Sequence, residues 1–197
     1  MNAPWCLGVL AGGFSRRMGR DKAGIRVHGR TLLEHAAGRY AREGVQVLVG
    51  TRPGGPGAAS PYQACLDLLP GEGPLSSLAA LLDAAGAPWL FALPVDLPLL
   101  PADIAERMLV RSEGARAVHL QVGQDPQPFP MLLRTDAVET ARRLLLAGER
   151  RAMSLLEALA ARRLAFDEVC PEEDPGTAFL NVNTPEDLER LRLLLPS

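Results

Sequence analysis

The sequence predicts an α/β fold in which a mostly parallel sheet carries helices on both faces. Short apolar runs alternate with helical patterns along almost the whole chain, which is typical of consecutive βα units. Apolar residues make up 47% of the 197 residues and charged residues 22%, ordinary proportions for a globular chain that is long enough to bury a core. Because no internal repeat or long linker interrupts the pattern, we expect one domain over residues 1–197.

The first half of the chain is predicted to alternate regularly between strands and helices. Its first apolar run ends at two glycines, and Thr31 and Glu34 then have the spacing of a helix capping box. Pro74 suits the first turn of the next helix. The expected elements are, in order, the strand Trp5–Leu10, the helix Thr31–Glu43, the strand Val45–Val49, the Gly- and Pro-rich loop Arg52–Pro61, the helix Leu75–Ala85 and the buried strand Trp89–Val95.

The second half of the chain is less regular. A proline opens its first helix, the turn-rich segment 123–126 separates two strand patterns, and Thr184 with Pro185 is a typical helix start. The expected elements are the helix Pro101–Ser112, the strands Ala115–Gln121 and Phe129–Arg134, the helices Asp136–Ala147 and Ala152–Ala161, the strand Leu164–Val169, an acidic loop Cys170–Thr177 and a last amphipathic helix from Pro185.

Charge and cysteine content exclude several classes of protein. The formal net charge of -2 and the isoelectric point near 5.9 argue against a nucleic-acid partner and a polybasic membrane anchor. The three cysteines are far apart and form no zinc or redox motif, so they are expected to be small core residues. Since the chain also lacks a signal-peptide pattern and a long apolar run, we expect a cytoplasmic protein with no membrane partner.

The loop after the first strand, residues 10–22, combines glycines with positive charge. Glycines directly after a strand let backbone N–H groups approach an anion closely. The loop also carries Arg16, Arg17, Arg20 and Lys22, and Lys22 is the single lysine of the chain. This combination favours a polyphosphate ligand, although it matches neither a Walker A loop nor a dinucleotide fingerprint. A plain glycine turn with solvated arginines is the alternative.

Asp96 follows the buried strand that ends at Val95. Ligands of open α/β sheets bind at the carboxyl ends of the strands, so Asp96 is expected to lie next to the first loop. Its carboxylate is a candidate ligand for Mg²⁺, which takes one or two carboxylates together with phosphate oxygens and water. The alternative, which position alone does not exclude, is that Asp96 only terminates the strand.

Asn181 and Asn183 precede the last helix with one residue between them. In an extended segment such residues point to the same face, so both amides could address one ligand. The pairs Arg150-Arg151 and Arg162-Arg163 are more typical of solvated helix faces.

These residues resemble a known family. The pattern Leu-Ala-Gly-Gly-x-Ser-x-Arg-Met-Gly-x-Asp-Lys at residues 10–22 resembles the nucleotidyltransferases, in particular the molybdenum cofactor guanylyltransferases. Further matching segments follow in the same order over residues 6–191, namely Gly73-Pro74-Leu75, Pro94-x-Asp96-x-Pro98, Gly148-Glu149-Arg150-Arg151 and the segment 181–188. The resemblance implies a Rossmann-like nucleotidyltransferase domain with a nucleotide-binding half at about 5–110 and an acceptor-binding half at about 111–197.

The resemblance also implies a reaction and roles for residues. The reaction is transfer of GMP from GTP to molybdopterin with release of pyrophosphate, by in-line attack at the α-phosphorus and with Mg²⁺ as cofactor. Family partners would be GTP, molybdopterin and, transiently, molybdoenzymes or other cofactor-biosynthesis proteins. Nucleotide contacts are implied for Leu10, Ala11, Gly12, Gly13, Lys22, Asp67 and Asp96, catalysis for Arg17, Lys22 and Asp96, metal binding for Asp96, and acceptor contacts for Arg150, Arg151, Asn181 and Asn183.

Four positions depart from the family pattern, and two other functions stay open. Gly50 stands where an asparagine is frequent, Val95 replaces a common cysteine, and Ser76-Ser77 replaces Ala-Gly. The first alternative is a related enzyme that uses CTP on the same acceptor or activates another metabolite. The second is an accessory protein that binds nucleotide or cofactor without catalysis. The sequence favours GTP because Leu-Ala-Gly-Gly occurs together with Gly-Pro-Leu.

Overall fold

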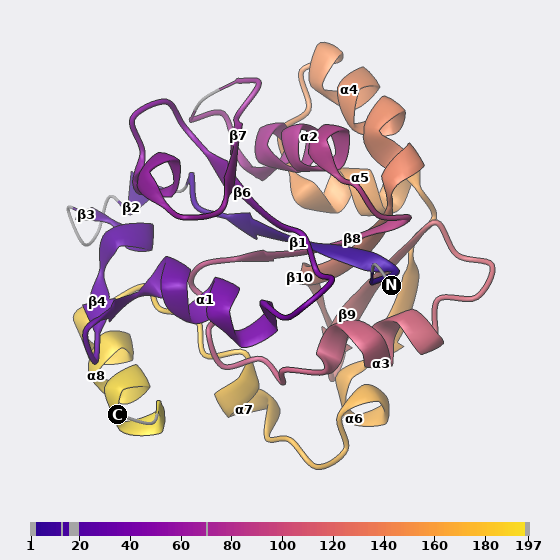
Figure 1. Ribbon diagram of the computed structural model, residues 1–197. Coiled ribbons are helices and arrows are strands. Elements are labelled where there is room, and N and C mark those ends of the chain that lie inside the picture. Colours follow the sequence, from indigo (N-terminus) through magenta and orange to yellow (C-terminus); the bar gives the residue numbers. More distant parts are fainter. Residues whose placement is uncertain (1–2, 13, 16–19, 70, 196–197) are drawn as a thin grey trace.

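The computed structural model describes residues 3–12, 14–15, 20–69 and 71–195, and Figure 1 shows how its elements are arranged. Seven strands of this part of the chain form one sheet. Their order across the sheet is β11 (Arg162–Ala165), β9 (Ala117–Val122), β10 (Asp125–Arg134), β8 (Trp89–Pro94), β1 (Trp5–Leu10), β6 (Val47–Thr51) and β7 (Gln63–Leu66).

The sheet is mostly parallel, as predicted. Strand β1 pairs in parallel with β6 and β8, β6 with β7, and β11 with β9. Only β10, among these seven strands, runs antiparallel to its neighbours β8 and β9. The carboxyl ends of β1, β6, β7 and β8 therefore meet at one edge of the sheet, where α/β folds bind their ligands.

Helices cover both faces of the sheet (Figure 1). One face carries α2 (Pro74–Ala84), α4 (Val138–Leu146) and α5 (Ala152–Ala158). The opposite face carries α1 (Leu32–Tyr40), α3 (Ile104–Val110), α6 (Phe166–Val169), α7 (Pro175–Ala178) and α8 (Pro185–Leu194). Shorter pieces are the hairpins β2 (Phe14–Ser15) with β3 (Arg20–Asp21) and β4 (Arg26–Val27) with β5 (Arg30–Thr31), and the 3₁₀ turns η1 (Lys22–Gly24), η2 (Pro56–Ala59) and η3 (Thr135–Ala137).

Two apolar cores, one on each side of the sheet, hold the helices in place. Residues of β1 point alternately into them: Trp5 and Leu7 join the core with α1, whereas Cys6 joins the core with α2. Phe91 meets both Trp5 and Tyr40 edge to face, with ring centroids 5.8 and 5.2 Å apart. Every residue of β1 is buried, since both faces of a parallel sheet are covered.

Several helix starts agree with the predictions. The Thr31 hydroxyl accepts a hydrogen bond from the backbone N–H of Glu34, and the Glu34 carboxylate accepts one from the N–H of Thr31. Thr184 caps α8 in the same way, with Asp187 as its partner. Pro74 occupies the first turn of α2, after Gly73 with its φ of 96°.

Two predictions from local pattern were wrong, and one strand was missed. The strand predicted over Leu164–Val169 ends at Ala165. The chain continues as the helical turn α6, in which Phe166 and Val169 lie on one side and are both buried. The loop predicted over residues 170–177 includes the start of α7, which the Asp174 carboxylate caps. Strand β7 was not predicted, because it is an edge strand of only four residues in which Cys65 alone is buried, too short to show a strand period.

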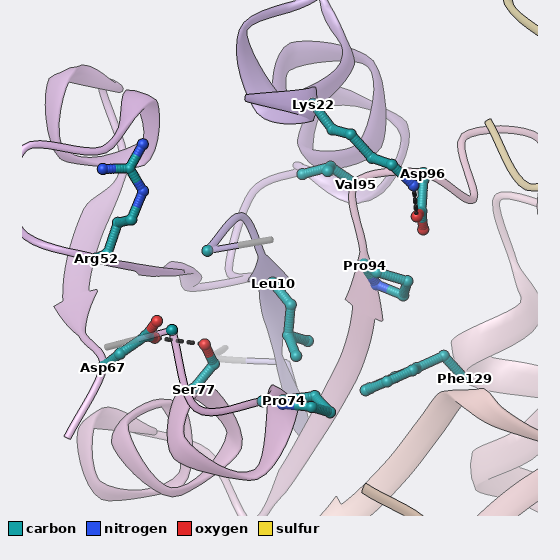
Figure 2. Close-up of a pocket in the computed structure, with 13 residues that line it drawn as sticks. Leu10, Lys22, Arg52, Asp67, Pro74, Ser77, Pro94, Val95, Asp96 and Phe129 are labelled. Atoms are coloured by element: carbon teal, nitrogen blue, oxygen red, sulfur yellow. Dashed lines mark hydrogen bonds and ion pairs between the residues drawn. The ribbon is translucent and has the colours of Figure 1, made fainter. Parts of the chain in front are cut away.

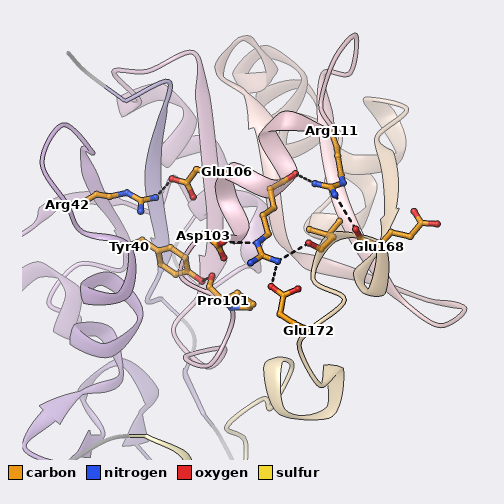
Figure 3. A network of polar contacts seen from close by, with 10 residues as sticks. Tyr40, Arg42, Pro101, Asp103, Glu106, Arg111, Glu168 and Glu172 are labelled. Atoms are coloured by element: carbon orange, nitrogen blue, oxygen red, sulfur yellow. Dashed lines mark hydrogen bonds and ion pairs between the residues drawn. The ribbon is translucent and has the colours of Figure 1, made fainter.

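A polar network ties α3 to the segment around α6 (Figure 3). Arg107 donates from Nε to Asp103 at 2.8 Å, pairs with Glu172 and donates to the Val169 carbonyl. Arg111 donates to the Glu168 carbonyl at 3.2 Å. These contacts fix the chain that leads from the sheet back towards residues 181–183. None of the described helices is both long and apolar enough to cross a membrane.

Candidate active site

A cavity of about 400 Å³ opens at the carboxyl ends of β1, β6, β7 and β8. It lies at the sheet edge where the sequence predicts the loop of residues 10–22 and the loop that carries Asp96. Figure 2 shows its charged and apolar lining side chains, with Leu10 in the middle. Predicted site residues in its wall are Leu10, Gly12, Lys22, Asp67 and Asp96.

Lys22 and Asp96 form an ion pair at one side of this cavity. Lys22 Nζ lies 2.6 Å from Asp96 Oδ2 and 2.6 Å from Asn183 Oδ1. Lys22 begins the turn η1, which the Asp21 carboxylate caps, whereas Asp96 follows β8. The contact thus joins the first loop, the loop after β8 and the segment before α8, and all three were singled out from sequence.

The second oxygen of Asp96 has a different environment. Asp96 Oδ1 is buried and has no hydrogen-bond partner among the described residues. A buried carboxylate oxygen without a partner is costly unless a cation or a donor completes it. Within the described ranges, no group of three or more His, Cys, Asp and Glu side chains could form an all-protein metal cage. Asp96 therefore suits a cation that takes one protein carboxylate and draws its other ligands from substrate and water.

Asn181 and Asn183 are joined to this side of the cavity. Asn183 Nδ2 donates to Asn181 Oδ1 at 2.9 Å, so the two amides do share one face. The backbone N–H of Val182, between them, donates to the carbonyl of Asp96 at 3.0 Å. Asn183 touches Lys22 directly, whereas Asn181 is exposed and contacts Asn183.

The end of β1 forms the floor of the cavity. The Leu10 carbonyl accepts from the N–H of Val95 at 3.2 Å, and the N–H of Ala11 donates to the Gly50 carbonyl at 2.8 Å. A Cβ at Gly12 would stand 2.6 Å from Asp67 Oδ2, so a larger residue there would have to displace this carboxylate. Gly13 and Arg17, two other predicted site residues, lie outside the described residues.

Asp67 lies at another part of the cavity wall, just after β7. Its carboxylate oxygen Oδ1 accepts a hydrogen bond from the Ser77 hydroxyl of α2. Burial raises the pKa of Asp67, and the bond from Ser77 partly opposes this shift. Asp67 and Ser77 thus form a polar contact in a wall that also contains Leu10, Pro74 and Phe129.

Three lining side chains were not predicted to be site residues, although Ser77 was noted as a departure from the family pattern. Arg52 pairs with Asp21 at 3.2 Å, and Ser77 and Phe129 also face the cavity (Figure 2). Arg52 begins a loop rich in Gly and Pro, in a chain where arginine is common, so no local signal marks it. Phe129 comes from β10, far along the chain, and only the sheet order brings it to β8.

Arg150 and Arg151 lie beside the cavity rather than in its wall. The Arg150 carbonyl accepts from the N–H of Leu75 at 3.2 Å, and a Cβ at Gly73 would stand 2.8 Å from that carbonyl. Arg150 Nε pairs with Glu72 at 2.6 Å, and Arg151 pairs with Glu149, whose pKa is held well below its usual value mainly by Arg151 and Ser154. Both arginines are engaged with carboxylates next to the Gly73 turn.

Comparison with known proteins gives consistent matches along the chain. A family model described as a MobA-like NTP transferase domain matches residues 7–164. A molybdenum cofactor guanylyltransferase of Xanthomonas euvesicatoria is 39% identical over 195 residues, which cover 97% of this chain and 96% of the relative. One from Cereibacter sphaeroides is 38% identical over 193 residues, 95% of each chain.

Solved structures show the same fold. Molybdopterin-guanine dinucleotide biosynthesis protein A of Archaeoglobus fulgidus matches with a TM-score of 0.80 at 22% identity, covering 95% of this chain and 97% of that one. The 2-C-methyl-D-erythritol 4-phosphate cytidylyltransferase of Thermus thermophilus matches with a TM-score of 0.65 at 23% identity, covering 94% and 96%. The predicted α/β nucleotidyltransferase fold is therefore confirmed, and the chain belongs to the MobA-like NTP transferase family.

Proposed function

We propose that this protein transfers GMP from GTP to molybdopterin, forming molybdopterin guanine dinucleotide and releasing pyrophosphate. The observation that carries the proposal is the cavity itself, with the Lys22–Asp96 ion pair at one side and the Asp67–Ser77 pair at another. A nucleoside triphosphate has matching parts, because its phosphates need cations and its base presents hydrogen-bonding groups. The names of the full-length relatives support the same reaction.

At the phosphate end, this chain supplies positive charge and positioning. A phosphate oxygen of molybdopterin attacks the α-phosphorus of GTP, a new O–P bond forms, and the bond to the bridging oxygen of pyrophosphate breaks. The attacking group is a phosphate monoester that is already anionic at pH 7, so no strong base is needed. Lys22 stabilises the charge that builds on the leaving pyrophosphate, and we assign the same role to Arg17.

Asp96 is the residue we assign to Mg²⁺. Its buried oxygen Oδ1, which has no partner in the part of the chain that the structure describes, fits a cation, while Oδ2 is held by Lys22. Bound there, Mg²⁺ would supply charge neutralisation on phosphate oxygens. Lys22, itself anchored by Asn183, keeps the Asp96 carboxylate in a fixed orientation.

At the base end, Asp67 favours guanine over cytosine. The Watson–Crick edge of guanine presents two adjacent N–H donors, N1–H and the 2-amino group, to one ionised carboxylate. The edge of cytosine presents a donor next to the acceptor N3, which a carboxylate repels. An ionised Asp is acceptor-only, so the side chain matches the guanine edge.

The acceptor is assigned to the second half of the chain. We infer that residues 5–110 form the nucleotide half and 111–197 the acceptor half, with Asn181, Asn183, Arg150 and Arg151 near the pterin and its phosphate. Asn183 contacts Lys22 and Arg150 adjoins the Gly73 turn, so both lie next to the nucleotide cavity. We also expect the protein in the cytoplasm, in transient contact with molybdoenzymes or other cofactor-biosynthesis proteins.

The test is turnover with each of the four nucleoside triphosphates, Mg²⁺ and molybdopterin. Pyrophosphate release and the mass of the product are measured together. We expect GTP to be preferred and the guanine dinucleotide to form. A preference for CTP would contradict the proposed substrate, and tight GTP binding without turnover would favour a nucleotide-binding accessory protein.

A further inference from the structure

Two buried polar side chains in the cavity wall depend on each other. Asp67 is 8% exposed and Ser77 is 4% exposed, and the Ser77 hydroxyl donates to Asp67 Oδ1. The two residues come from different elements, since Asp67 follows the edge strand β7 and Ser77 lies in the first turns of α2. Figure 2 shows the pair pointing towards each other beside the end of β1.

The hydroxyl of Ser77 decides which way the Asp67 carboxylate faces. With Oδ1 held by Ser77, the other oxygen Oδ2 lies on the Gly12 side, where a Cβ at Gly12 would stand 2.6 Å away. Gly12 and Asp67 line the same cavity, so Oδ2 lies at the edge of the space proposed for the nucleotide.

Ser77 is itself fixed by close packing. A Cβ at Gly50 would stand 3.1 Å from Ser77 Cβ and 3.3 Å from Leu81 Cδ1, so the space over Gly50 is filled by α2. Ser77 has little room to move away from Asp67, and the hydroxyl is pre-positioned before any ligand binds.

The protonation state of Asp67 determines which base edge it accepts. Ionised, the carboxylate offers two acceptors and matches the two N–H donors of guanine. Protonated, it offers one donor and one acceptor, and that arrangement matches the edges of adenine and cytosine. Burial favours the protonated acid, and the Ser77 hydrogen bond favours the carboxylate.

We propose that Ser77 is a positioning residue that sets base selectivity: its hydroxyl holds Asp67 Oδ1 and turns the carboxylate to the guanine edge, and so disfavours ATP and CTP. This inference rests on the proposed function, which it deepens.

Among the described residues, the charged side chains that line the cavity together with Asp67 pair with other side chains. Lys22 and Asp96 contact each other, and Arg52 pairs with Asp21. The Cys65 thiol of β7 has a pKa raised by burial and carries no charge near neutral pH. Ser77 is thus the side chain from α2 that tunes Asp67.

The experiment measures equilibrium binding of Mg·GTP and Mg·ATP to wild type and to Ser77→Ala by calorimetry, without acceptor, between about pH 5 and pH 8. For Ser77→Ala we expect the Kd of GTP to rise about tenfold and the preference for GTP over ATP to fall by a similar factor. The loss of GTP affinity in acid should also begin at higher pH, because removal of the hydrogen bond raises the pKa of Asp67.

Ser112→Ala is the matched control. Ser112 is also buried, at 5% exposed, but it donates to the Leu109 carbonyl at the end of α3, on the opposite layer. Its loss should lower the Tm comparably and leave the GTP preference unchanged. If Ser77→Ala does not fold, Ser77→Cys keeps nearly the same volume and replaces the hydroxyl by a weak thiol donor.

The outcomes separate the two proposals. If wild type binds GTP tightly and both Ser77→Ala and Ser77→Cys keep the same GTP affinity, the same GTP preference and the same loss of affinity in acid, the role of Ser77 is overturned. The proposed function is not affected by that result. Weak GTP binding by wild type, relative to another triphosphate, would overturn the proposed function and the Ser77 assignment with it.

Discussion

Lys22 from the first loop and Asp96 from the loop after β8, 74 positions apart in sequence, lie in direct contact at 2.6 Å. Lys22 is the single lysine of the chain, and every other basic side chain apart from histidine is an arginine. The ammonium group reaches two small acceptors, Asp96 Oδ2 and Asn183 Oδ1, at the same distance. A compact point charge suits this position better than a planar guanidinium.

Asp96→Ala should abolish GMP transfer while leaving the fold intact. The change removes the carboxylate assigned to Mg²⁺ and leaves Lys22 without its anionic partner, so we expect a loss of at least about 100-fold in turnover. Dinucleotide formation and the Tm are measured side by side. Asp136→Ala is the control, because Asp136 is exposed and pairs with Arg116 at the surface. Near-normal turnover of Asp96→Ala would refute the metal assignment.

Lys22→Arg should lower activity clearly although it conserves charge. A guanidinium is larger than the ammonium group and cannot place one nitrogen 2.6 Å from both Asp96 Oδ2 and Asn183 Oδ1 without moving them. We expect kcat/KM for GTP to fall by about tenfold or more. Arg116→Lys, a swap at the surface, should leave kcat/KM unchanged. Equal kinetics of Lys22→Arg and wild type would mean that the lone lysine is accidental.

Gly8→Ala should destabilise the protein without touching the cavity. A Cβ at this position in β1 would stand 2.8 Å from Leu90 Cδ1 and 3.2 Å from Leu81 Cδ1, and both leucines are fully buried. Overpacking of this kind costs about 1–3 kcal/mol in the free energy of unfolding, measured in urea. The comparison is Gly176→Ala, whose nearest contact would be Asp174 at 3.4 Å. Equal stability of the two variants would contradict the tight packing described around β1.

Thr31→Ala should remove the capping box of α1 and weaken the pH dependence of the stability that this capping box provides. The pKa of Glu34 is lowered by hydrogen bonds from the backbone and side chain of Thr31. A lowered pKa in the folded state means that ionised Glu34 stabilises the fold above its unfolded value of 4.5, and that this contribution is lost as the pH falls through the folded pKa. We expect a cost of about 1 kcal/mol at pH 7, and a smaller one at about pH 3.

Glu34→Gln is the control for that experiment. Glutamine still completes a capping box but does not ionise, so the acid-dependent part should disappear while much of the cap remains. A cost of Thr31→Ala that is the same at both pH values would contradict the assigned role of Glu34.

Local signals in the sequence were enough for most of the fold. Apolar runs located β1, β6 and β8, and the cap residues Thr31 and Thr184 located two helix starts within a residue or two. These local signals failed where the burial of a segment depends on its contacts with other parts of the chain. Strand β7 forms because it pairs with β6, and α6 forms because the helical turn buries both Phe166 and Val169 in the core.

For the site, the sequence by itself determined which residues we propose to carry chemistry: the glycine loop with its single lysine, Asp96 after a buried strand, and the paired asparagines. The tertiary structure alone decided which of them meet. Lys22 contacts Asn183 across 161 positions, and Asp67 finds Ser77 and Gly12 from separate elements. The physical reason is that periodicity and capping act within a few residues, whereas contacts at the sheet edge depend on strand order, which is fixed only when all the strands and helices pack together.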